Sequence, residues 1–505
     1  MLEHKRRYLQ IAFNYDLYHM QRILPTIPFN DRILIEAGTP FIKREGLEGI
    51  RAIARIWKGV IVADLKTLDG AEDEVDFVNG AGATAATVLG SAPVETLNLF
   101  IARCRDLDLD RILSLDEERR KTLTRLEDLR HKKNLANEEI SNLLKERKSP
   151  QQKIDEIKKI SKEADKLKDN LKRIEAELNR FLLFVPNIPD ESVPVGKDPE
   201  ENKIIRVWGK LPEFDFSPLT HLELSEHLDI IDFNRASKIA GSNFALFKGE
   251  GAKLERALIN FMLDLHIKKH GYTELSVPHL VNRVAMTGTG QLPKLELDMY
   301  KLHDDDYFLI PTAEVPVTNI YRNEILDEED LPKYFTAYTP CYRREAGSYG
   351  KETKGLVRVH QFDKVELVKF VRPQDSYNEL ESLVRDAEEV LQLLGLPYRV
   401  VLLSTEGLSF SASKCYDLEA YAVGLNKWLE VSSCSNFLDF QARRANIRYR
   451  EKDTKRIAYL HTLNGSGVAL ARTVICILEN YQEKDGTITI PEVLRAYMEG
   501  KSKIG

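Results

Sequence analysis

The segment that decides the fold of the C-terminal part of the chain is Cys341-Tyr342-Arg343-Arg344-Glu345, then a loop, then Val359-His360-Gln361-Phe362-Asp363-Lys364-Val365-Glu366. Both halves are typical of β-strands, and the loop between them predicts that the second strand returns beside the first. Residues two apart share one face of a strand, so Arg343 and Glu345 would point in the same direction.

The loop between these strands combines glycines with cations: it contains Gly347, Gly350, Gly355, Lys351, Lys354 and Arg358. Arginine can donate two parallel N–H groups to a phosphate, and a flexible cationic loop suits a polyanion. The segment therefore predicts a site for ATP. Neither the Walker pattern nor the Rossmann glycine pattern occurs in the chain, so the common phosphate-binding loops do not account for it.

Composition limits the class of protein. The chain has 505 residues, a net charge of −6 and 43% hydrophobic residues, which indicates a soluble multidomain protein without a global basic field. The five cysteines are far apart, so a reducing compartment fits best. No apolar run long enough for a membrane span and no signal-peptide core is found, and we expect a cytoplasmic protein.

Four regions are expected. Residues 1–104 alternate short β-branched runs with helical stretches, which predicts βα units and a parallel sheet. Residues 105–184 are rich in Lys, Glu and Leu, and apolar residues recur at spacings of three and four on both sides of Pro150, which predicts an antiparallel helical hairpin. Residues 185–212 are expected to form a semi-extended linker, and residues 213–505 a long α+β domain.

From about residue 105 onward the chain resembles a bacterial-type seryl-tRNA synthetase, a class II aminoacyl-tRNA synthetase. The resemblance rests on segments that occur in the order typical of that family: 270–278 (motif 1), 287–294, Thr312-Ala313-Glu314, 343–366 (motif 2), 430–436, and 464–473 (motif 3). It implies an antiparallel-sheet catalytic domain preceded by a helical arm. It also implies a homodimer formed through motif 1, and activation of L-serine by ATP and Mg²⁺ followed by transfer to tRNA(Ser), with tRNA(Sec) left open as a further acceptor.

The resemblance also implies a role for each site residue. Arg343 would bind the α-phosphate, Arg472 the γ-phosphate, and Glu345 the adenine amino group. The remaining ATP-site residues would be Arg344, Val359, Phe362, Glu430, Val431, Ser432 and Ser433. Glu430 and Ser433 offer the oxygen ligands that Mg²⁺ prefers. The serine pocket would consist of Thr312, Ala313, Glu314, Glu366 and Ser466.

The predicted hairpin carries cations near its tip, at Lys145, Arg147, Lys148 and Lys153. Cations on a rigid rod can follow RNA phosphates, and in the resembled family the arm recognises the long variable arm of the tRNA. Taken alone, a Lys/Glu-rich coiled coil is more often a solvated rod that binds a protein partner. For the whole chain, an alternative to the enzyme is a synthetase-like RNA-binding protein without catalysis.

The first hundred residues resemble a different family, the first half of hexulose-phosphate synthase in the orotidine-monophosphate decarboxylase superfamily. Glu36, Asp64, Lys66 and Asp69 carry this resemblance. About four of the eight βα units of such a barrel fit before residue 104, so independent lyase activity is not expected. A bifunctional fusion remains a second alternative.

Cysteine and histidine residues inside the motifs have less specific interpretations. We expect Cys341 and Cys434 to be small core residues. We expect His360 and His461 to be packed or hydrogen-bonded, not catalytic. The chain resembles the type of seryl enzyme without zinc, so no zinc is expected.

Overall fold

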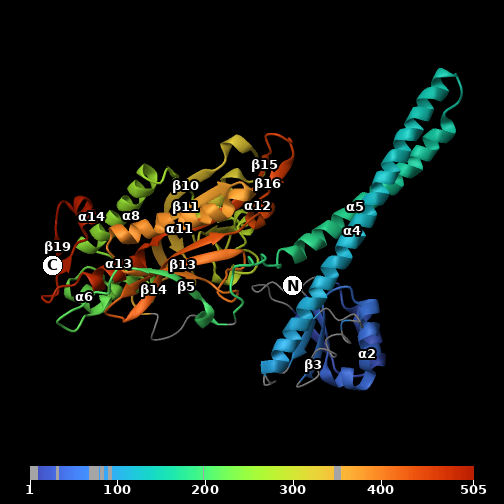
Figure 1. Ribbon diagram of the computed structural model, residues 1–505. Helices are drawn as coiled ribbons and strands as arrows, with labels where there is room; N and C mark the ends of the chain where they lie inside the picture. The colour runs from blue at the N-terminus through green and yellow to red at the C-terminus, as the bar shows by residue number, and fades with distance from the viewer. Residues whose placement is uncertain are drawn as a thin grey trace. The chain divides into compact units, whose positions relative to one another are not determined.

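The computed structural model describes residues 9–29, 33–67, 79, 85–88, 94–196, 198–345 and 354–505. The chain divides into two units, Met1–Leu182 and Leu183–Gly505, which are described separately here. Together they confirm the expected α+β class, with a helical hairpin before an antiparallel-sheet domain (Figure 1).

The first unit begins with a four-stranded parallel sheet in the order β1-β2-β3-β4. The strands are β1 (Leu9–Phe13), β2 (Ile33–Ala37), β3 (Ile61–Thr67) and β4 (Ala85–Val88). Helices α1 (Leu17–Ile23) and α2 (Thr39–Ile56) add Met20, Phe41 and Ile53 to its core. This arrangement confirms the predicted alternation of strands and helices.

Two long helices, α4 (Val94–Lys145) and α5 (Gln151–Leu182), form the predicted antiparallel hairpin. The helices are held by buried apolar residues, among them Leu115, Leu126 and Leu129 of α4 and Ile174 and Leu178 of α5. Ion pairs between the two helices support the same register: Arg111–Glu177, Arg119–Glu175, Arg125–Glu163 and Lys153–Glu139. Helix α4 continues without a break through residue 104, where a domain boundary is predicted from the sequence.

An eight-stranded sheet organises the second unit, in the order β5-β12-β13-β14-β17-β11-β10-β6. All of its pairs are antiparallel except β10 with β6. The strands are β5 (Lys203–Trp208), β6 (Thr273–Glu274), β10 (Lys333–Tyr342), β11 (Gln361–Val371), β12 (Tyr398–Leu402), β13 (Lys414–Ala422), β14 (Lys427–Asn436) and β17 (His461–Ala469). Strand β5 comes from the predicted linker, so part of that segment belongs to the sheet.

One face of this sheet is covered by three helices, α8 (Glu250–Lys268), α11 (Ser376–Leu393) and α13 (Leu470–Asn480) (Figure 1). They share the largest apolar core of the unit with alternate residues of β11, such as Val365 and Leu367. Residues of opposite parity on the same strand, such as Val368 and Phe370, join a separate core on the other face, as the two-residue period of a strand requires.

Shorter elements complete the unit. The helices are α6 (His221–His227), α7 (Phe233–Ala240), α9 (Arg283–Gly288), α10 (Glu314–Thr318), α12 (Phe440–Ala445) and α14 (Glu492–Arg495). The small sheets pair β7 (Leu280–Asn282) with β8 (Tyr307–Leu309), join β9 (Ile325–Asp327), β15 (Arg448–Arg450) and β16 (Ile457–Tyr459), and pair β18 (Ile488–Thr489) with β19 (Lys503–Ile504).

Candidate active site

A cavity of about 580 Å³ opens on the face of the large sheet opposite α11. Its wall brings together residues from segments more than 150 positions apart in the sequence. The predicted site residues that line it are Thr312, Glu314, Arg343, Glu345, Val359, Phe362, Glu430, Val431, Ser432, Ser433, Ser466 and Arg472. Three predicted residues, Ala313, Arg344 and Glu366, do not line it.

These three residues lie close behind the wall. Ala313 and Glu366 are fully buried. Arg344 donates from Nη1 to the carbonyl of Leu297 at 3.2 Å, so its guanidinium holds the neighbouring loop. Residues 346–353 of the predicted cationic loop, including Gly347, Gly350 and Lys351, lie outside the described residues.

Glu314 and Lys364 line the floor of the cavity, and the buried Glu366 carboxylate lies directly behind them. Lys364 Nζ lies 2.5 Å from Glu366 Oε2 and donates to Thr312 Oγ1 at 3.0 Å. Asn464 donates from Nδ2 to both carboxylates, at 2.9 Å to Glu314 and 2.8 Å to Glu366. Two negative charges therefore share one lysine, and the cluster has an excess of negative charge next to the cavity.

The pKa of Glu314 reports this excess. Burial, together with the neighbouring Glu366 carboxylate, raises its pKa to about 7. Gln441 limits the rise, because its Nε2 donates to Glu314 Oε1 at 2.6 Å. A cation entering the cavity would be attracted by this carboxylate and would bring its pKa back down.

On the motif 2 side, Arg343 follows directly after β10, and its guanidinium lies 5.3 Å from the centre of the Phe362 ring on β11. Its Nε donates to the carbonyl of Pro311 at 3.3 Å, which leaves the outer N–H groups beside the cavity. Glu345 adopts a left-handed backbone conformation, with φ at 47°, and accepts from Arg358 Nη1 at 3.1 Å. The aromatic ring and the guanidinium thus line the same wall.

On the motif 3 side, Arg472 lies in the first turn of α13. Its Nη1 donates to the Glu430 carbonyl at 2.7 Å and to the Glu430 carboxylate at 3.2 Å, and its Nε donates to the Val357 carbonyl at 3.2 Å. These contacts hold the second guanidinium at the cavity wall, between β14 and the segment that leads into β11.

Two β-bulges beside the cavity change which residues face it. In β14, Leu418 pairs with Ser432 and Glu419 with Glu430, so Val431 is an extra residue. Glu430 and Ser433 are three positions apart, yet both line the cavity because of this bulge. In β17, Val468 pairs with Val365 and Ser466 with Glu366, so Gly467 is an extra residue there.

The oxygen atoms of Glu430 and Ser433 fit a hard divalent cation. A third carboxylate, Asp417, is hydrogen-bonded to Ser433, and burial together with Glu430 raises the pKa of Asp417 to about 8. A group of three or more His, Cys, Asp or Glu side chains arranged for a metal is not found among the described residues.

Several site residues have no role assigned from the sequence, namely Lys364, Asn464, Gln441 and Asp417, although the first two lie inside the quoted motifs. Lys364 and Asn464 each lie two positions before a predicted residue on a strand, so the period of two places them on the same face and could have found them. The sequence offers no comparable signal for Gln441, which reaches Glu314 from α12.

The expectations for cysteine and histidine are confirmed where the structure tests them. Cys341 and Cys434 are fully buried. His360 Nδ1 lies 3.1 Å from the carbonyl oxygen of Arg343, and His461 Nδ1 lies 3.0 Å from Ser376 Oγ. Burial lowers the pKa of His461 to about 4, so this ring is neutral at physiological pH.

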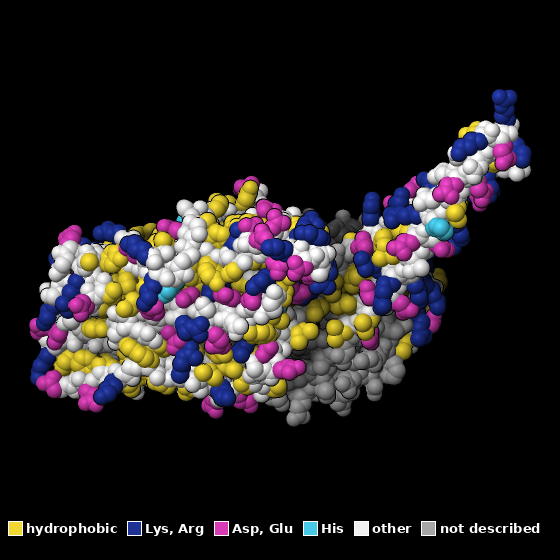
Figure 2. All heavy atoms as spheres, turned by 45° about the horizontal axis from the view of Figure 1, so that its top comes forward, with side chains coloured by type: hydrophobic (Ala, Val, Ile, Leu, Met, Phe, Trp, Pro, Cys, Tyr) yellow, Lys and Arg dark blue, Asp and Glu magenta, His cyan; other side chains and the backbone are white. Residues whose placement is uncertain are grey.

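At the hairpin tip, the predicted cations differ in their ion pairs. Lys148 pairs with Glu146 at 2.8 Å, and Lys153 pairs with Glu139 and Glu156. Among the described residues, no ion pair is found for Lys145 or Arg147. Positive and negative side chains are intermixed along the visible face of the hairpin (Figure 2).

The residues expected for a lyase are only partly described. Glu36 accepts from Gln10 Nε2 across β1 and β2, and Asp64 lies on β3. Asp69 and the side chain of Lys66 lie outside the described residues. Among the described helices, none is long and apolar enough to cross a membrane.

Two family models match the chain. The seryl-tRNA synthetase N-terminal domain matches residues 100–189, and the class II tRNA synthetase core domain (G, H, P, S and T) matches residues 298–481. Residues 1–99 lie outside both matches, so the comparisons do not support the resemblance of this segment to hexulose-phosphate synthase.

Relatives and solved structures agree with these matches. The serine–tRNA ligases of Thermodesulfovibrio yellowstonii and Carboxydothermus hydrogenoformans are 58% and 57% identical, each over 78% of this chain and 93% of its own length. The seryl-tRNA synthetase of Pyrococcus horikoshii, solved in complex with ATP, superposes with a TM-score of 0.72 at 40% identity, over 78% of this chain and 92% of that one. On these grounds the chain belongs to the seryl-tRNA synthetase family of class II aminoacyl-tRNA synthetases.

Proposed function

We propose that the chain is a serine–tRNA ligase in which the cavity residues have the roles described below. ATP and L-serine react to seryl adenylate and pyrophosphate, and the seryl group then passes to the 3′ end of tRNA(Ser), with tRNA(Sec) as a second acceptor. The observation that carries this proposal is a cavity with Glu314 at its floor, the linked Glu366 carboxylate behind it, and an arginine on each of two walls. Family membership favours this function over a non-catalytic RNA-binding protein or a bifunctional lyase.

The amino acid would bind at the floor of the cavity. Glu314, with its excess negative charge, would accept the serine ammonium, while Glu366 supports it through Asn464. Ser466 and Thr312 would lie beside the small hydroxyl group, and Ala313 would close the pocket beneath them. A pocket that hydrogen-bonds the hydroxyl discriminates against alanine, because alanine leaves these polar groups unpaired.

ATP would bind between the two arginines. Arg343 would neutralise the α-phosphate where negative charge accumulates in the transition state, and Arg472 would bind the γ-phosphate. Phe362 would stack on the adenine, with Glu345 at its amino group. Arg344 would hold the adjoining loop. Val359, Val431 and Ser432 would complete the wall.

Mg²⁺ would be held by Glu430 and Ser433, with phosphate oxygens completing its shell, and would supply charge neutralisation at the phosphates. The Glu430 carboxylate pairs with the Arg472 guanidinium. Both groups are then poised for opposite charges, the carboxylate for the cation and the guanidinium for the phosphate.

The second step needs no covalent nucleophile from the protein. The 3′-terminal ribose hydroxyl attacks the seryl carbonyl, AMP leaves, and positioning with charge stabilisation carries the rate. We propose residues 105–184 as the tRNA-binding arm, 185–212 as the connection, and 213–505 as the catalytic domain. Lys145 and Arg147 are the best candidates to contact RNA phosphates, with Lys148 and Lys153 next to them.

We further propose a cytoplasmic homodimer formed through residues 270–278. Residues 1–104 would be an appended βα module that resembles a half-barrel and contributes no lyase chemistry. Aminoacylation by the full chain and by a chain that begins near Asp110 would show whether this module affects catalysis.

Serine-dependent exchange of pyrophosphate into ATP tests the proposal. We expect exchange by the full chain, and a loss of about 10²- to 10³-fold in Arg343→Ala, because one preorganised donor to a developing charge is removed. Arg456→Ala is the matched control, since this arginine is 73% exposed and directly precedes β16. Absence of serine-dependent exchange in the full chain would contradict the function, and full activity in Arg343→Ala would contradict the site.

A further inference from the structure

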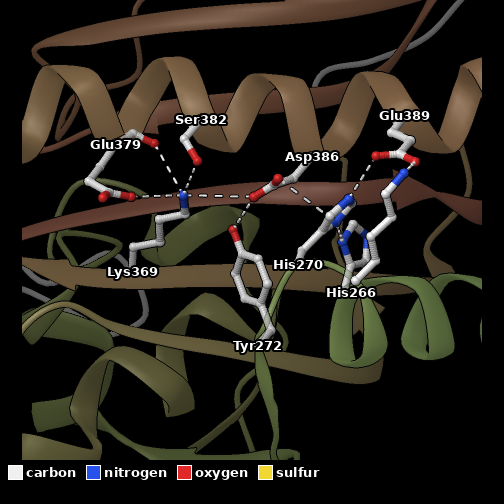
Figure 3. Close-up of polar contacts among 9 residues, drawn as sticks. His266, His270, Tyr272, Lys369, Glu379, Ser382, Asp386 and Glu389 are labelled. Carbon is white, nitrogen blue, oxygen red and sulfur yellow. Dashed lines mark hydrogen bonds and ion pairs between the residues drawn. The ribbon is translucent and has the colours of Figure 1, made fainter.

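A second polar cluster lies on the face of the large sheet that is away from the cavity (Figure 3). Its side chains come from the end of α8 and the turn that follows, from α11, and from β11. The members are His266, Lys269, His270, Tyr272, Lys369, Glu379, Ser382, Asp386 and Glu389. None of these residues has a role in catalysis or substrate binding above, although His270 and Tyr272 belong to the proposed dimer segment 270–278.

His266 is the cluster member that contacts β17, the strand that carries the first residues of motif 3. Its side chain is fully buried, and burial together with His270 lowers its pKa to about 3, so the ring is neutral. Its Nδ1 lies 2.9 Å from His270 Nδ1, while its Nε2 has no hydrogen-bond partner among the described residues. The unpartnered edge of the ring faces β17.

The contact on β17 is the bulged residue Gly467. A Cβ atom built on Gly467 would lie 2.8 Å from His266 Nε2 and 3.3 Å from Val365 Cγ1, so only glycine fits here without a shift. The imidazole therefore packs directly against the backbone at the bulge. Because a bulge changes which side chains face each side of a sheet, this contact supports the point where β17 changes its alternation.

The bulge has a direct consequence for the cavity. Asn464 and Ser466 line the cavity as alternate residues, but the next residue of β17 in the wall is Ala469, whereas Val468 points into the opposite core. Helix α13 begins at Leu470 and carries Arg472 into the wall. The position of Gly467 thus fixes Ser466 on one side and the start of α13 on the other.

The other cluster members fix the imidazole in its orientation. His270 Nε2 lies 3.0 Å from Glu389 Oε2, so His270 carries a proton on this nitrogen and its Nδ1 is turned to His266. Lys269 pairs with the same Glu389 carboxylate. Asp386 lies 3.8 Å from His270 Nδ1 and accepts from the Tyr272 hydroxyl at 2.8 Å. An apolar ring of similar size could fill the space but would not be held in one orientation by this chain.

We propose that His266 is a positioning residue for serine activation: its imidazole, oriented by His270 and Glu389, holds the Gly467 bulge and thereby sets Ser466 and Arg472 at the cavity. This inference rests on the proposed function. It adds a residue that touches neither substrate and that belongs to the last turn of α8, and it connects that helix to the active-site wall through one backbone contact.

The test is a size exchange across this contact. Gly467→Ala places a methyl group against the ring, His266→Ala removes the ring, and the double variant gives the methyl group the vacated space. We expect Gly467→Ala to raise the KM for serine or lower kcat by about 10- to 100-fold, because small displacements of positioned groups are costly. The double variant should recover much of this loss, which is a coupling that two independent defects would not show.

Each variant is assayed by serine-dependent exchange and by thermal unfolding, with His303→Ala as control, since this histidine side chain is 98% exposed. Normal kinetics in Gly467→Ala would overturn the proposal, as would a double variant no better than the product of the single effects. Gly467→Ala retains all side chains of the cluster, so its kinetics test the proposal even if His266→Ala does not fold. Failure of the parent chain to exchange would instead contradict the proposed function.

Discussion

Strand β11 carries two buried lysines that face opposite sides of the sheet, Lys364 and Lys369, and both pair with carboxylates. Lys364 lies at the cavity with Glu366 and Thr312. Lys369 lies under α11 and donates to Glu379 Oε2 and Ser382 Oγ, both at 3.0 Å (Figure 3). The same residue type in the same strand thus serves two differently built clusters.

The two clusters differ in whether each buried charge has enough hydrogen-bonding partners of opposite charge. Lys369 reaches Glu379 twice, through its carboxylate and its backbone carbonyl, and Asp386 lies 3.7 Å away, so every ammonium proton has an acceptor. Lys364 pairs with Glu366 beside an open cavity, and burial together with Glu366 raises the pKa of the neighbouring Glu314 to about 7. A satisfied buried cluster holds a fold together, whereas an unbalanced one is prepared for a charged ligand.

The largest expected effect comes from breaking the satisfied cluster. Lys369→Met should lower the free energy of unfolding by ~3–5 kcal/mol, because two carboxylates lose their buried cation. Serine activation per folded molecule should change little, since the Lys369 ammonium is bonded to Glu379 and Ser382 and not to His266, His270 or Glu389. Denaturant unfolding with active-site titration measures both. A variant as stable as the parent would show that this ion pair contributes nothing.

The sequence predicts one of these clusters better than the other. Motif residues identify Thr312, Glu314, Glu366 and Ser466, and the period of a strand adds Lys364. The residues that satisfy Lys369 come from α11, and no local pattern relates a lysine on a strand to side chains of a helix that follows it. Which α11 side chains reach Lys369 depends on how the helix packs on the sheet, and no local sequence pattern reports this packing.

The β-bulges are a second feature of the site that the sequence pattern does not predict. Strict alternation would place Glu430 and Ser433 on opposite faces, and only the extra residue Val431 brings both to the cavity. The resemblance to a family supplies such pairs without explaining them. By contrast, the spacing of apolar residues predicts the helical hairpin directly, because its core depends on contacts between two regular helices.

Replacing the lysine at the cavity should affect serine binding more than stability. Lys364→Met should raise the KM for serine about 10- to 100-fold, since charge-assisted hydrogen bonds contribute ~1.5–3 kcal/mol each. Stability should fall less than in Lys369→Met, because Glu366 keeps the donors Thr312 and Asn464. Paired measurements of KM and of the unfolding midpoint test this. The reverse order of stability losses would contradict the distinction between the two clusters.

A smaller effect follows from the pH dependence of Glu314. The raised pKa means that Glu314 is mostly protonated below pH 7, so serine should bind more weakly there, with KM about tenfold higher at pH 6 than at pH 8. A carboxyl with a raised folded pKa contributes stability that is present at low pH and is lost as pH rises through about 7. Glu314→Gln should therefore bind serine poorly at every pH and unfold at a higher temperature than the parent at pH 8. A pH-dependent KM that persists in Glu314→Gln would place the titrating group elsewhere.

The smallest effect is expected for a lysine whose ion pair is shorter but exposed. Lys452 Nζ lies 2.6 Å from Glu329 Oε1, closer than Lys369 to Glu379, and the two side chains are 64% and 69% exposed. Lys452→Ala should leave the unfolding midpoint and the KM for serine unchanged, because water solvates both charges when the pair is broken. If Lys452→Ala destabilised the chain as much as Lys369→Met, then the ion-pair distance would determine how much each lysine contributes to stability. If it does not, the contribution of each lysine follows from its burial and from whether its partners retain other donors.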